Sequence, residues 1–579
     1  MSRNSFRAFD SEAVGVFLFS FVLVLSSLAS TFGYDVAAEQ ALYNARLIPA
    51  PNFVEYNSDV VVFNDNLRCE IVLPDEFFNE STEQIDAATQ LTRKFFAKYY
   101  NAQIKVECKS LASAFEAAQK TEGADEKEKK FLAKLDASKD KFFAASNATS
   151  MLTLADASTS GDVAPSDIMN RRETAQGKLI IASSDVAGVR DALKTLRQLA
   201  EAFGDSNSAK LSRSFVPGLE LYDQPALSFR GIHLCWFPET DLSRIEQAIR
   251  IAAYYKFNYA VIEFWGTFPF QNHPELYWDQ YHTTKEDVKR LVALGKELGI
   301  ELIPQMNLFG HATEARVSVG KHTTLDRYPD FEPLFEPDGW TWNVLNPEAR
   351  KTLAECVVEL YETFDSPKFF HIGCDEAYSS GSSFLARRSG DYVDKLADWL
   401  VFFHDLLKER DCRMMMWHDM LISGADFGGY VVGANATTKG LIDKLPKDVL
   451  ICDWQYGKPK EKETWPTSEY FGSKGFEVVS CPWRETSGII SLGKNAAEKR
   501  YFGLLCTTWH HFYGEDMRNI LTLGAQATWG TPYRGSGFDK QRAVNRHLQQ
   551  INNEIKNRKY EDGGVDKYQV IKDTNGPQG

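Results

Sequence analysis

Two adjacent carboxylic acids, Asp375 and Glu376, follow a short apolar run that begins at Phe369. Side chains on a strand alternate between its two faces, so His371, Gly373 and Asp375 would share one face. Glu376 can then reach the pocket of Asp375 only if the strand ends between the two acids. A strand that stops on paired acids is how a β/α barrel builds an active site, whereas the alternative is a solvated Asp-Glu pair.

Polar and aromatic residues follow other apolar runs in the same way. An arginine could instead form a surface ion pair, and any tryptophan could be core. Together they predict a box of tryptophans around two carboxyl groups, with an arginine and a histidine. The residues are Arg230 on the first run, His311 after the third, Trp417 on the fifth, Asp453, Trp454 and Tyr456 at the sixth, Trp483 and Arg484 after the seventh, and Trp509 to His511 after the eighth.

Strand-like runs alternating with helical patterns would bring these residues to one rim. One helix is indicated by the stripe of Leu353, Val357 and Leu360, which Asn346 caps and Pro347 opens. Eight such strands predict an α/β protein with a (β/α)8 TIM barrel, while a doubly wound sheet lacks its glycine-rich fingerprint here. The predicted strands are 228–235, 259–263, 301–306, 369–373, 413–417, 449–454, 477–480 and 503–508.

The remaining segments predict a small α/β domain before the barrel and a helix after it. The small domain is expected to hold extended segments at 60–72 and 178–182 and helices at 83–100 and 186–203, and a linker is expected at 217–225. The predicted domains are a signal peptide and leader at 1–38, the α/β domain at 39–216 with a charged helical insertion near 110–176, the barrel at 217–535, and a C-terminal helix and tail at 536–579.

The N-terminal residues resemble an export signal, because Arg3 and Arg7 precede an apolar run from Ala13 to Leu25. Cleavage is expected after Ala29 or Ala38. The run is too short for a comfortable membrane span, so membrane anchoring is expected only if this segment stays uncleaved. We expect a secreted or periplasmic protein, or a lysosomal or extracellular one in a eukaryote.

Net charge and aromatic content indicate which classes of ligand the protein could bind. A net charge of −14 argues against nucleic acid, which needs a basic surface. The excess of aromatic residues, with 12 Trp, 23 Tyr and 39 Phe, favours a carbohydrate site, since sugar rings pack against aromatic faces. The nine cysteines lack zinc-site spacing. Neither a metal nor another cofactor is expected. Cys69 and Cys108 are the candidate disulfide pair. The sequence does not predict the oligomeric state.

The order of motifs resembles glycoside hydrolase family 20, the β-N-acetylhexosaminidases. Residues 371–376 read His-Ile-Gly-Cys-Asp-Glu, similar to the family's H-x-G-G-D-E signature, and hexosaminidase D-like members share the Gly-Cys-Asp-Glu form. The resemblance spans about residues 178 to 530. Its other segments are 192–199 in the small domain and 229–231, 303–311 and 480–483 in the first, third and seventh barrel strands.

The resemblance implies hydrolysis of terminal N-acetyl-β-hexosaminides, gluco or galacto, on an oligosaccharide or glycoconjugate. The mechanism would be retaining and substrate-assisted, passing through an oxazolinium intermediate. Glu376 would be the general acid, and Asp375 would orient the acetamido N–H and offset the developing charge. The substrate-binding residues would be Arg230 for sugar hydroxyls, Trp417 and Trp509 as pocket walls with Trp454, Trp483 and Arg484 beside them, and His311 and His371 as orienting groups.

Departures from the family pattern predict altered sugar recognition. Tyr456 becomes the candidate hydroxyl donor to the acetamido oxygen, because Arg484 stands where the family often has that tyrosine. The other departures are Cys374 for the second signature glycine, Cys235 for the acid of the first strand, a segment 263–266 without the usual paired aspartates, and His511 for the acid that reads O4 and O6.

The sequence leaves two other functions open. One is a catalytically weak carbohydrate-binding barrel, which the retention of both Asp375 and Glu376 opposes. The other is a retaining glycosidase with a protein nucleophile, which needs a second carboxylate about 5 Å from Glu376. Glu263 and Asp453 are the candidates for that role. A metal hydrolase is least favoured, because no His/Asp ligand spacing converges.

Overall fold

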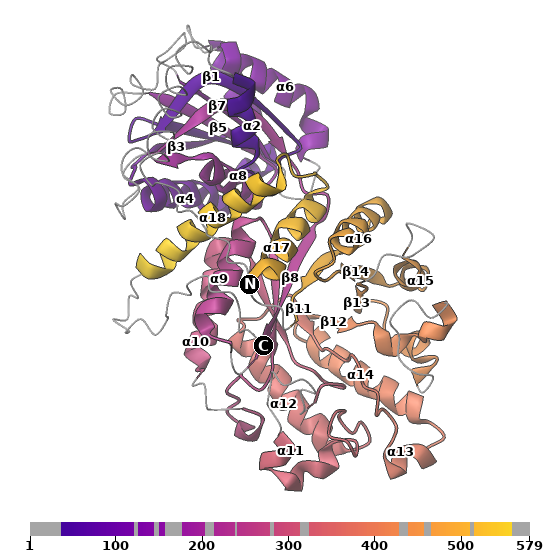
Figure 1. The fold of residues 1–579 in the computed structure, drawn as a ribbon. Coiled ribbons are helices and arrows are strands. Elements are labelled where there is room, and N and C mark those ends of the chain that lie inside the picture. Colours follow the sequence, from indigo (N-terminus) through magenta and orange to yellow (C-terminus); the bar gives the residue numbers. More distant parts are fainter. Residues whose placement is uncertain are drawn as a thin grey trace, which may run out of the picture.

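The computed structural model describes residues 36–80, 82–120, 126–143, 150–156, 176–202, 214–237, 240–277, 283–312, 324–427, 438–456, 465–509 and 514–557. A small α/β domain, indigo to purple in Figure 1, lies beside one end of a closed barrel, and the yellow helix α18 (Gly537–Asn557) runs between them. The predicted signal peptide lies outside the described residues. The last residues of the predicted leader, from Val36, belong to helix α2 (Val36–Asn44).

The small domain is a mixed sheet between two helical layers. Residues Leu179 and Ile181 of β5 pack toward α4 (Thr82–Tyr100) and α8 (Val186–Leu199), while Ile180 and Ala182 pack toward α5 (Leu111–Lys120) and α6 (Glu126–Phe143). The alternation is that of a strand buried on both faces. The strand order is β1 (Phe53–Phe63), β7 (Ser214–Asp223), β4 (Ser150–Asp156), β5 (Gly177–Ser183), β2 (Arg68–Leu73) and β3 (Lys105–Ser110), with β6 (Glu201–Ala202) on β7 and α3 (Asp75–Glu80) after β2.

The predicted linker at 217–225 is wrong for most of its length, because those residues belong to β7. Pro217 lies opposite Val60 of β1, whereas β4 pairs with β7 only from Leu219 onward. Pro217 therefore has a strand on one side only, where a missing N–H is tolerated. The domain boundary moves from residue 216 to a point after Asp223. Strand β4 likewise lies inside the segment predicted as a helical insertion.

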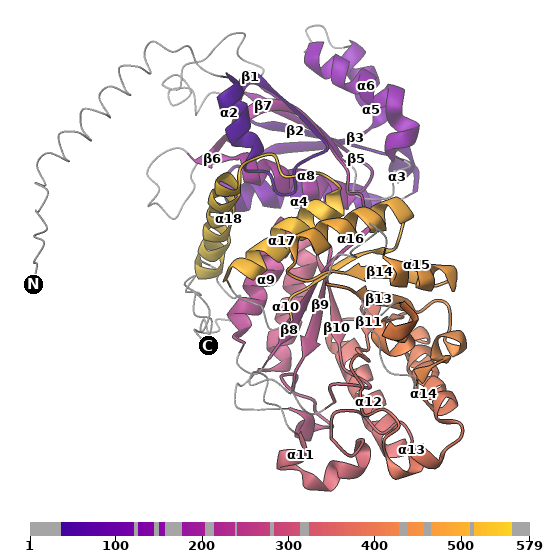
Figure 2. The same cartoon turned by 45° about the vertical axis from the view of Figure 1, so that its right-hand side comes forward.

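The predicted (β/α)8 barrel is confirmed. Eight parallel strands close in the order β10-β11-β12-β13-β14-β15-β8-β9 (Figure 2). They are β8 (Phe229–Trp236), β9 (Tyr259–Phe264), β10 (Glu301–Gln305), β11 (Phe369–His371), β12 (Arg413–Trp417), β13 (Leu450–Trp454), β14 (Glu477–Cys481) and β15 (Gly503–Thr507). The outer helices are α9 (Leu242–Tyr254), α10 (Lys285–Leu298), α12 (Pro347–Thr363), α14 (Tyr392–Lys408), α15 (Pro466–Ser473), α16 (Thr486–Lys499) and α17 (Gly514–Trp529).

Short helices occupy the loops after the strands. They are η1 (Pro274–Leu276), α11 (Thr324–Arg327), η3 (Pro329–Leu334), α13 (Phe384–Arg388), η4 (Asp419–Leu421), η5 (Gly424–Phe427) and η7 (Leu441–Lys444). In Figure 1, α11 and α13 lie at the end of the barrel away from the small domain. The carboxyl ends of the strands therefore face away from the small domain.

Strand alternation decides which side chains enter the barrel. Phe229, Tyr259 and Phe369 contact one another near the starts of their strands, with ring centroids 4.4 to 5.9 Å apart. Toward the other end the interior becomes polar, with His233 and Glu263 fully buried and hydrogen-bonded to each other. Burying such groups requires partners, so the polar layer marks the end of the barrel at which chemistry is expected.

Helix α18 joins the two domains. Glu554 pairs with Arg197 of α8 in the small domain and lies 3.5 Å from Arg250 of α9 on the barrel. His547 is fully buried, and its Nδ1 lies 3.2 Å from the Tyr255 hydroxyl. The predicted polar C-terminal helix is thus amphipathic, and its buried face belongs to the domain interface.

All nine cysteines are free, so the candidate disulfide between Cys69 and Cys108 is wrong. The parallel register of β2 and β3 explains this, because it sets Cys69 opposite Val106 and Cys108 opposite Ile71. Among the described helices, none combines the length and the apolar character needed to cross a membrane.

Candidate active site

The two acids follow β11 in an unusual backbone conformation. The strand ends at His371, earlier than predicted, and Gly373, Cys374 and Glu376 take positive φ angles of 64°, 75° and 48°. A Cβ on Gly373 would lie 2.0 Å from Oδ1 of Asn307, so only glycine fits there. The turns bring Asp375 and Glu376 to the rim with different exposure. The Asp375 side chain is 5% exposed and that of Glu376 35%.

His311 connects the two acids. Its Nε2 lies 3.4 Å from Oδ2 of Asp375 and 3.3 Å from Oε2 of Glu376. Burial alone would lower the pKa of His311, but Asp375 and then Glu376 raise it to about 10. Burial raises the pKa of Asp375, and the His311 charge opposes that rise. An imidazolium therefore lies between two carboxyl groups, where it can hold both in place.

Two tryptophans that were not predicted as site residues enclose His311. Its ring centroid lies 4.4 Å from that of Trp340 and 5.3 Å from that of Trp265. Trp340 also donates a hydrogen bond of 2.8 Å from Nε1 to the carbonyl oxygen of Glu376. Trp265 directly follows β9 and could have been found as another aromatic residue at a strand end. Trp340 lies in a long loop, where sequence periodicity carries no signal.

Two further side chains contact Glu376 and were also missed. The Tyr378 hydroxyl donates a hydrogen bond of 2.7 Å to Oε1 of Glu376. Oδ2 of Asp419 accepts the backbone N–H of Glu376 at 2.8 Å. Asp419 lies two residues after Trp417 at a strand end, so the pattern that singled out the paired acids could have identified it too.

The predicted box of aromatic residues forms one connected cluster. Trp417 and Trp509 have ring centroids 5.4 Å apart, and Nε1 of Trp509 donates to the Tyr456 hydroxyl at 2.6 Å. The Tyr456 ring stacks on Trp454 and lies 5.2 Å from Trp483. Burial raises the pKa of Tyr456, and the charge of nearby Asp375 adds to the rise. The aromatic cluster and the acids therefore share one end of the barrel.

His371 faces the same cluster from inside the barrel. Its ring lies 4.3 Å from that of Trp417, and its Nδ1 accepts the N–H of Gly373 at 3.0 Å. Burial holds the pKa of His371 well below its usual value, so the ring is neutral. His371 thus supports the turn before the acids and the Trp417 wall, as expected for an orienting group.

Arg230 does not belong to this rim, and its prediction as a sugar-binding residue is wrong. It lies at the start of β8, on the outward face that it shares with Ile232 and Leu234. Its guanidinium donates to the carbonyl oxygens of Lys256 and Leu227 and lies 3.6 Å from Asp191 of α8. The motif identified the strand correctly, but Arg230 lies at the strand end and on the strand face that are next to the small domain.

The last two predicted residues differ in what the structure describes. Arg484 lies at the outer edge of the aromatic cluster, with its guanidinium 4.5 Å from the Trp483 ring centroid and 3.7 Å from Asp516. Its side chain is 40% exposed, so it could reach only the outer part of a bound ligand. His511 lies outside the described residues, and its predicted role stays a prediction.

A buried polar network supports the site from below. Oε2 of Glu263 lies 2.8 Å from Nε2 of His233 and accepts from the Cys235 thiol at 3.3 Å, while Oε1 accepts from Asn307 at 2.8 Å. Burial would raise the pKa of Glu263, but its bonds to His233 and Asn307 lower it overall. His233, Cys235 and Glu263 have the side-chain types of a metal site. However, their hydrogen bonds already satisfy the carboxylate, so they fit a proton-sharing network better.

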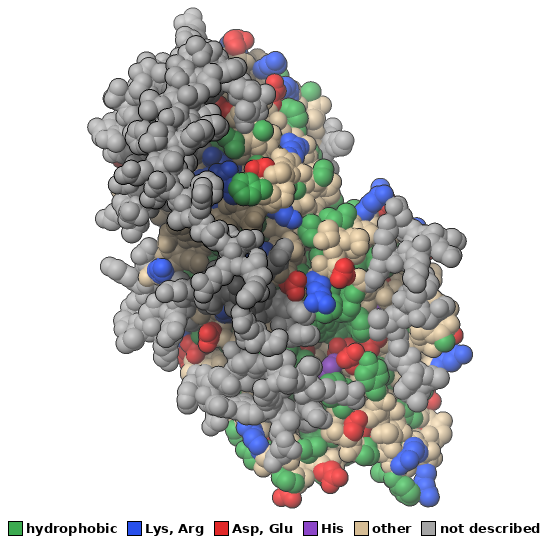
Figure 3. Space-filling model, viewed as in Figure 1, with side chains coloured by type: hydrophobic (Ala, Val, Ile, Leu, Met, Phe, Trp, Pro, Cys, Tyr) green, Lys and Arg blue, Asp and Glu red, His purple; other side chains and the backbone are tan. Residues whose placement is uncertain are grey.

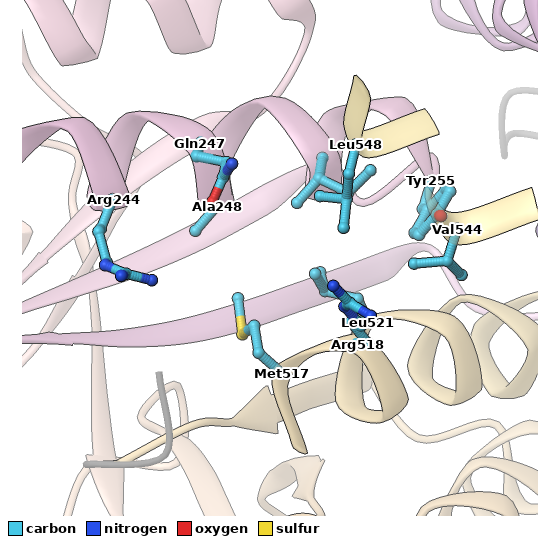
Figure 4. Close-up of a pocket in the computed structure, with 10 residues that line it drawn as sticks. Arg244, Gln247, Ala248, Tyr255, Met517, Arg518, Leu521, Val544 and Leu548 are labelled. Atoms are coloured by element: carbon cyan, nitrogen blue, oxygen red, sulfur yellow. The ribbon is translucent and has the colours of Figure 1, made fainter. Parts of the chain in front are cut away.

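Two small cavities of about 50 Å³ each differ in their relation to this site. One adjoins His311 and is lined by Trp265, Met306 and Trp342 among others. The other lies between α9, α17 and α18, where Arg244, Gln247 and Arg518 line an otherwise apolar gap without a carboxyl group (Figure 4). The first belongs to the rim and the second to helix packing. Figure 3 shows a histidine beside acidic and apolar side chains on the exposed barrel surface.

A TIM barrel with paired carboxyl groups and an aromatic cluster at its carboxyl rim is the arrangement that barrel glycoside hydrolases use. Comparison with known proteins identifies the particular family that the chain resembles. Residues 266–518 match the model of the glycosyl hydrolase family 20 catalytic domain.

Known relatives show the same likeness. The chain is 26% identical over 207 residues to a chitooligosaccharidolytic beta-N-acetylglucosaminidase of Bombyx mori, covering 34% of each protein. It is 25% identical over 318 residues to a beta-hexosaminidase of Vibrio furnissii, covering 47% of this chain and 46% of that protein. The chain thus spans between a third and a half of these relatives' lengths. The Flavobacterium johnsoniae chitobiase structure superposes with a TM-score of 0.57 at 15% identity over 88% of this chain and 74% of that one, which shows a shared fold.

Proposed function

We propose that this protein hydrolyses terminal non-reducing N-acetyl-β-hexosaminides with retention of configuration, using the substrate's acetamido group as nucleophile. The observation that carries the proposal is the contact of His311 with both Asp375 and Glu376 at the rim of a family 20 barrel. One acid is buried and the other is accessible to solvent. Such a difference suits two distinct roles for two neighbouring carboxyl groups.

In the first step the acetamido oxygen attacks the anomeric carbon while the glycosidic bond breaks. Glu376 gives its proton to the leaving oxygen, and Asp375 accepts a hydrogen bond from the acetamido N–H as positive charge develops on the oxazolinium. In the second step water attacks the anomeric carbon, Glu376 takes a proton from that water, and the oxazolinium reopens to the acetamide. Configuration is retained because two inversions occur.

The carboxylates considered as protein nucleophiles have other roles. Both oxygens of Glu263 accept hydrogen bonds inside the barrel. Asp453 lies on the outward face of β13 and accepts hydrogen bonds from Thr467 and Ser468 near α15. A nucleophile must approach the anomeric carbon with a free lone pair, so these arrangements favour the acetamido group.

The aromatic cluster supports a sugar as ligand, and the hydroxyl of Tyr456 is our candidate donor to the acetamido oxygen. Trp509 uses that hydroxyl oxygen as an acceptor, so this bond does not use the proton of Tyr456. We also propose, from the N-terminal sequence, that the protein is exported. Edman sequencing or mass spectrometry of the mature N-terminus tests this, with a start after Ala29 or Ala38 as the expected result.

The decisive experiment compares wild type with Glu376→Gln on two N-acetyl-β-hexosaminides, one with an activated aryl leaving group and one with a sugar leaving group. Removing the general acid should lower kcat/KM for the sugar aglycone by roughly 10² to 10⁴, and for the activated aryl group by less. Glu477→Gln, at the opposite end of the barrel and exposed, is the matched control and should leave both rates unchanged. Equal losses on both substrates would exclude Glu376 as the acid, and an inactive wild type would exclude the proposed hydrolysis.

A further inference from the structure

Asp419 is a third carboxyl group beside the paired acids. It is the first residue of the 3-10 turn η4, directly after β12 and His418, and is 2% exposed. Its Oδ2 accepts the backbone N–H of Glu376 at 2.8 Å. The N–H of Trp417 donates to the carbonyl oxygen of Gly373 at 3.0 Å, so the two chain segments continue to pair beyond their strands. The Asp419 carboxyl group forms the last link of that pairing.

The N–H that Asp419 accepts belongs to a strained piece of backbone. Cys374 and Glu376 both have a side chain and a positive φ, a conformation that costs on the order of 1–3 kcal/mol for each such residue. A buried N–H without an acceptor would add to that cost. Loss of the acceptor would therefore allow this segment to relax toward ordinary φ angles. Such a relaxation would rotate the Glu376 carboxyl group away from its present direction.

The other contacts of Glu376 hold different atoms. Tyr378 donates to the carboxylate oxygen Oε1, and Trp340 donates to the carbonyl oxygen. Tyr378 lies only two residues away and moves with the same segment. Asp419 holds the amide from a neighbouring strand end, so it provides a fixed reference point outside the segment. Burial and the charges of Asp375 and Glu376 raise the pKa of Asp419 to about 8, and a protonated carboxyl group retains a carbonyl oxygen that can accept the N–H.

We propose that Asp419 is a positioning residue for the hydrolysis inferred above: through the Glu376 amide it fixes the left-handed turn that aims the Glu376 carboxyl group at the leaving oxygen. The inference rests on the proposed function. It assigns Asp419 no contact with the substrate. Its effect must therefore appear in the proton-transfer step and not in the affinity for the sugar.

Three variants separate this role from general support of the fold. Asp419→Ala removes the acceptor, while Asp419→Asn retains a carbonyl oxygen of the same reach. Met420→Ala is the matched control. Met420 is the next residue of the same turn and is 1% exposed, but the acceptor of the Glu376 N–H is Asp419 and not Met420. Kinetics are measured for each variant on the activated aryl substrate and on the substrate with a sugar aglycone.

For Asp419→Ala we expect kcat on the sugar aglycone to fall about 10- to 100-fold and kcat on the activated aryl substrate to fall several-fold less, with KM within about twofold. Asp419→Asn should recover kcat to within about fivefold of wild type. Met420→Ala should change both substrates by the same factor. Equal losses on the two substrates in Asp419→Ala, or no recovery in Asp419→Asn, would overturn the inference.

A second measurement does not depend on turnover. Hydrogen exchange of the Glu376 amide, followed by mass spectrometry on peptides spanning 372–378, should be at least about tenfold faster in Asp419→Ala than in wild type and Asp419→Asn. An unchanged exchange rate would refute the anchoring of this amide by Asp419. An inactive wild type with the expected exchange pattern would instead place the failure in the proposed hydrolysis, since the anchoring would stand.

Discussion

Replacing His311 by glutamine removes the positive charge between the two acids and tests the electrostatic core of the site. Two unit charges about 4 Å apart interact by about 4 kcal/mol at the effective dielectric constant of a partly buried pair. His311 lies 3.4 Å from Asp375, and the glutamine amide retains part of the hydrogen bonding. We therefore expect a net loss of about 2–3 kcal/mol in transition-state stabilisation, which is a fall of roughly 10² in kcat/KM near neutral pH.

The pKa shifts of Asp375 and His311 predict the direction in which His311→Gln changes the pH profile. The charge of His311 lowers the pKa of Asp375 against the effect of burial, so its removal raises that pKa further. In the proposed mechanism Asp375 must be ionised to stabilise the oxazolinium, so the acid limb of the pH profile should move to higher pH. In the folded protein the pKa of His311 is raised from 6.5 to about 10. Its contribution to stability is thus fully present below pH 6.5 and is lost as the pH rises through 10.

The assay records kcat/KM between pH 4 and 9 and the Tm between pH 6 and 10 for wild type and His311→Gln. His404→Gln is the control, because His404 also lies between two carboxylates, Asp405 and Asp448, each 2.8 Å away, but on the outer helix α14. The control should leave the acid limb in place. An unshifted acid limb in His311→Gln, with kcat/KM within threefold of wild type, would refute the electrostatic account of the site.

Three further outcomes are expected. Asp375→Asn should lower kcat more than it raises KM, and a thiazoline analogue of the oxazolinium should inhibit the wild type; a covalent sugar on a protein carboxylate, detected by mass spectrometry during turnover, would contradict both. Arg230→Gln should destabilise the protein by about 3 kcal/mol in denaturant unfolding, while KM stays unchanged, because it removes one of the two cations beside the buried Asp191 and the donor to the carbonyl oxygens of Lys256 and Leu227; a raised KM would restore Arg230 to the sugar site. His511→Glu should move the gluco-to-galacto ratio of kcat/KM toward gluco, and an unchanged ratio would show that His511 does not read O4.

The sequence predicted the barrel well because its strands are continuous apolar runs, and each predicted strand lies within two residues of an observed one. Motifs also placed His311, His371 and the aromatic cluster at the correct end. Arg230 was misplaced because a motif gives the strand, whereas the end of the strand and the face of the residue depend on register. Pro217 was read as a linker because the sequence does not show that β7 has a partner on only one side at that point.

Asp419 and Trp340 were missed for a different reason. Both act through backbone atoms of Glu376, and such contacts depend on the left-handed turn from Gly373 to Glu376. A run of positive φ angles at residues with side chains cannot be foreseen from propensity, which disfavours it. Tertiary contacts impose that turn, so the contacts that hold it become visible only in three dimensions, although the position of Asp419 at a strand end could have marked it as a candidate.

The placement of α18 has a consequence for how the chain reaches its final state. Glu554 and Arg197, which join the helix to the small domain, are 357 positions apart, so this junction can form only after nearly all of the described chain has been synthesised. Until then the Arg197 and Tyr99 surface of the small domain and the Tyr254 surface of the barrel lack their cover from α18. The order of the chain therefore makes the burial of these two surfaces under α18 one of the last steps of assembly during synthesis.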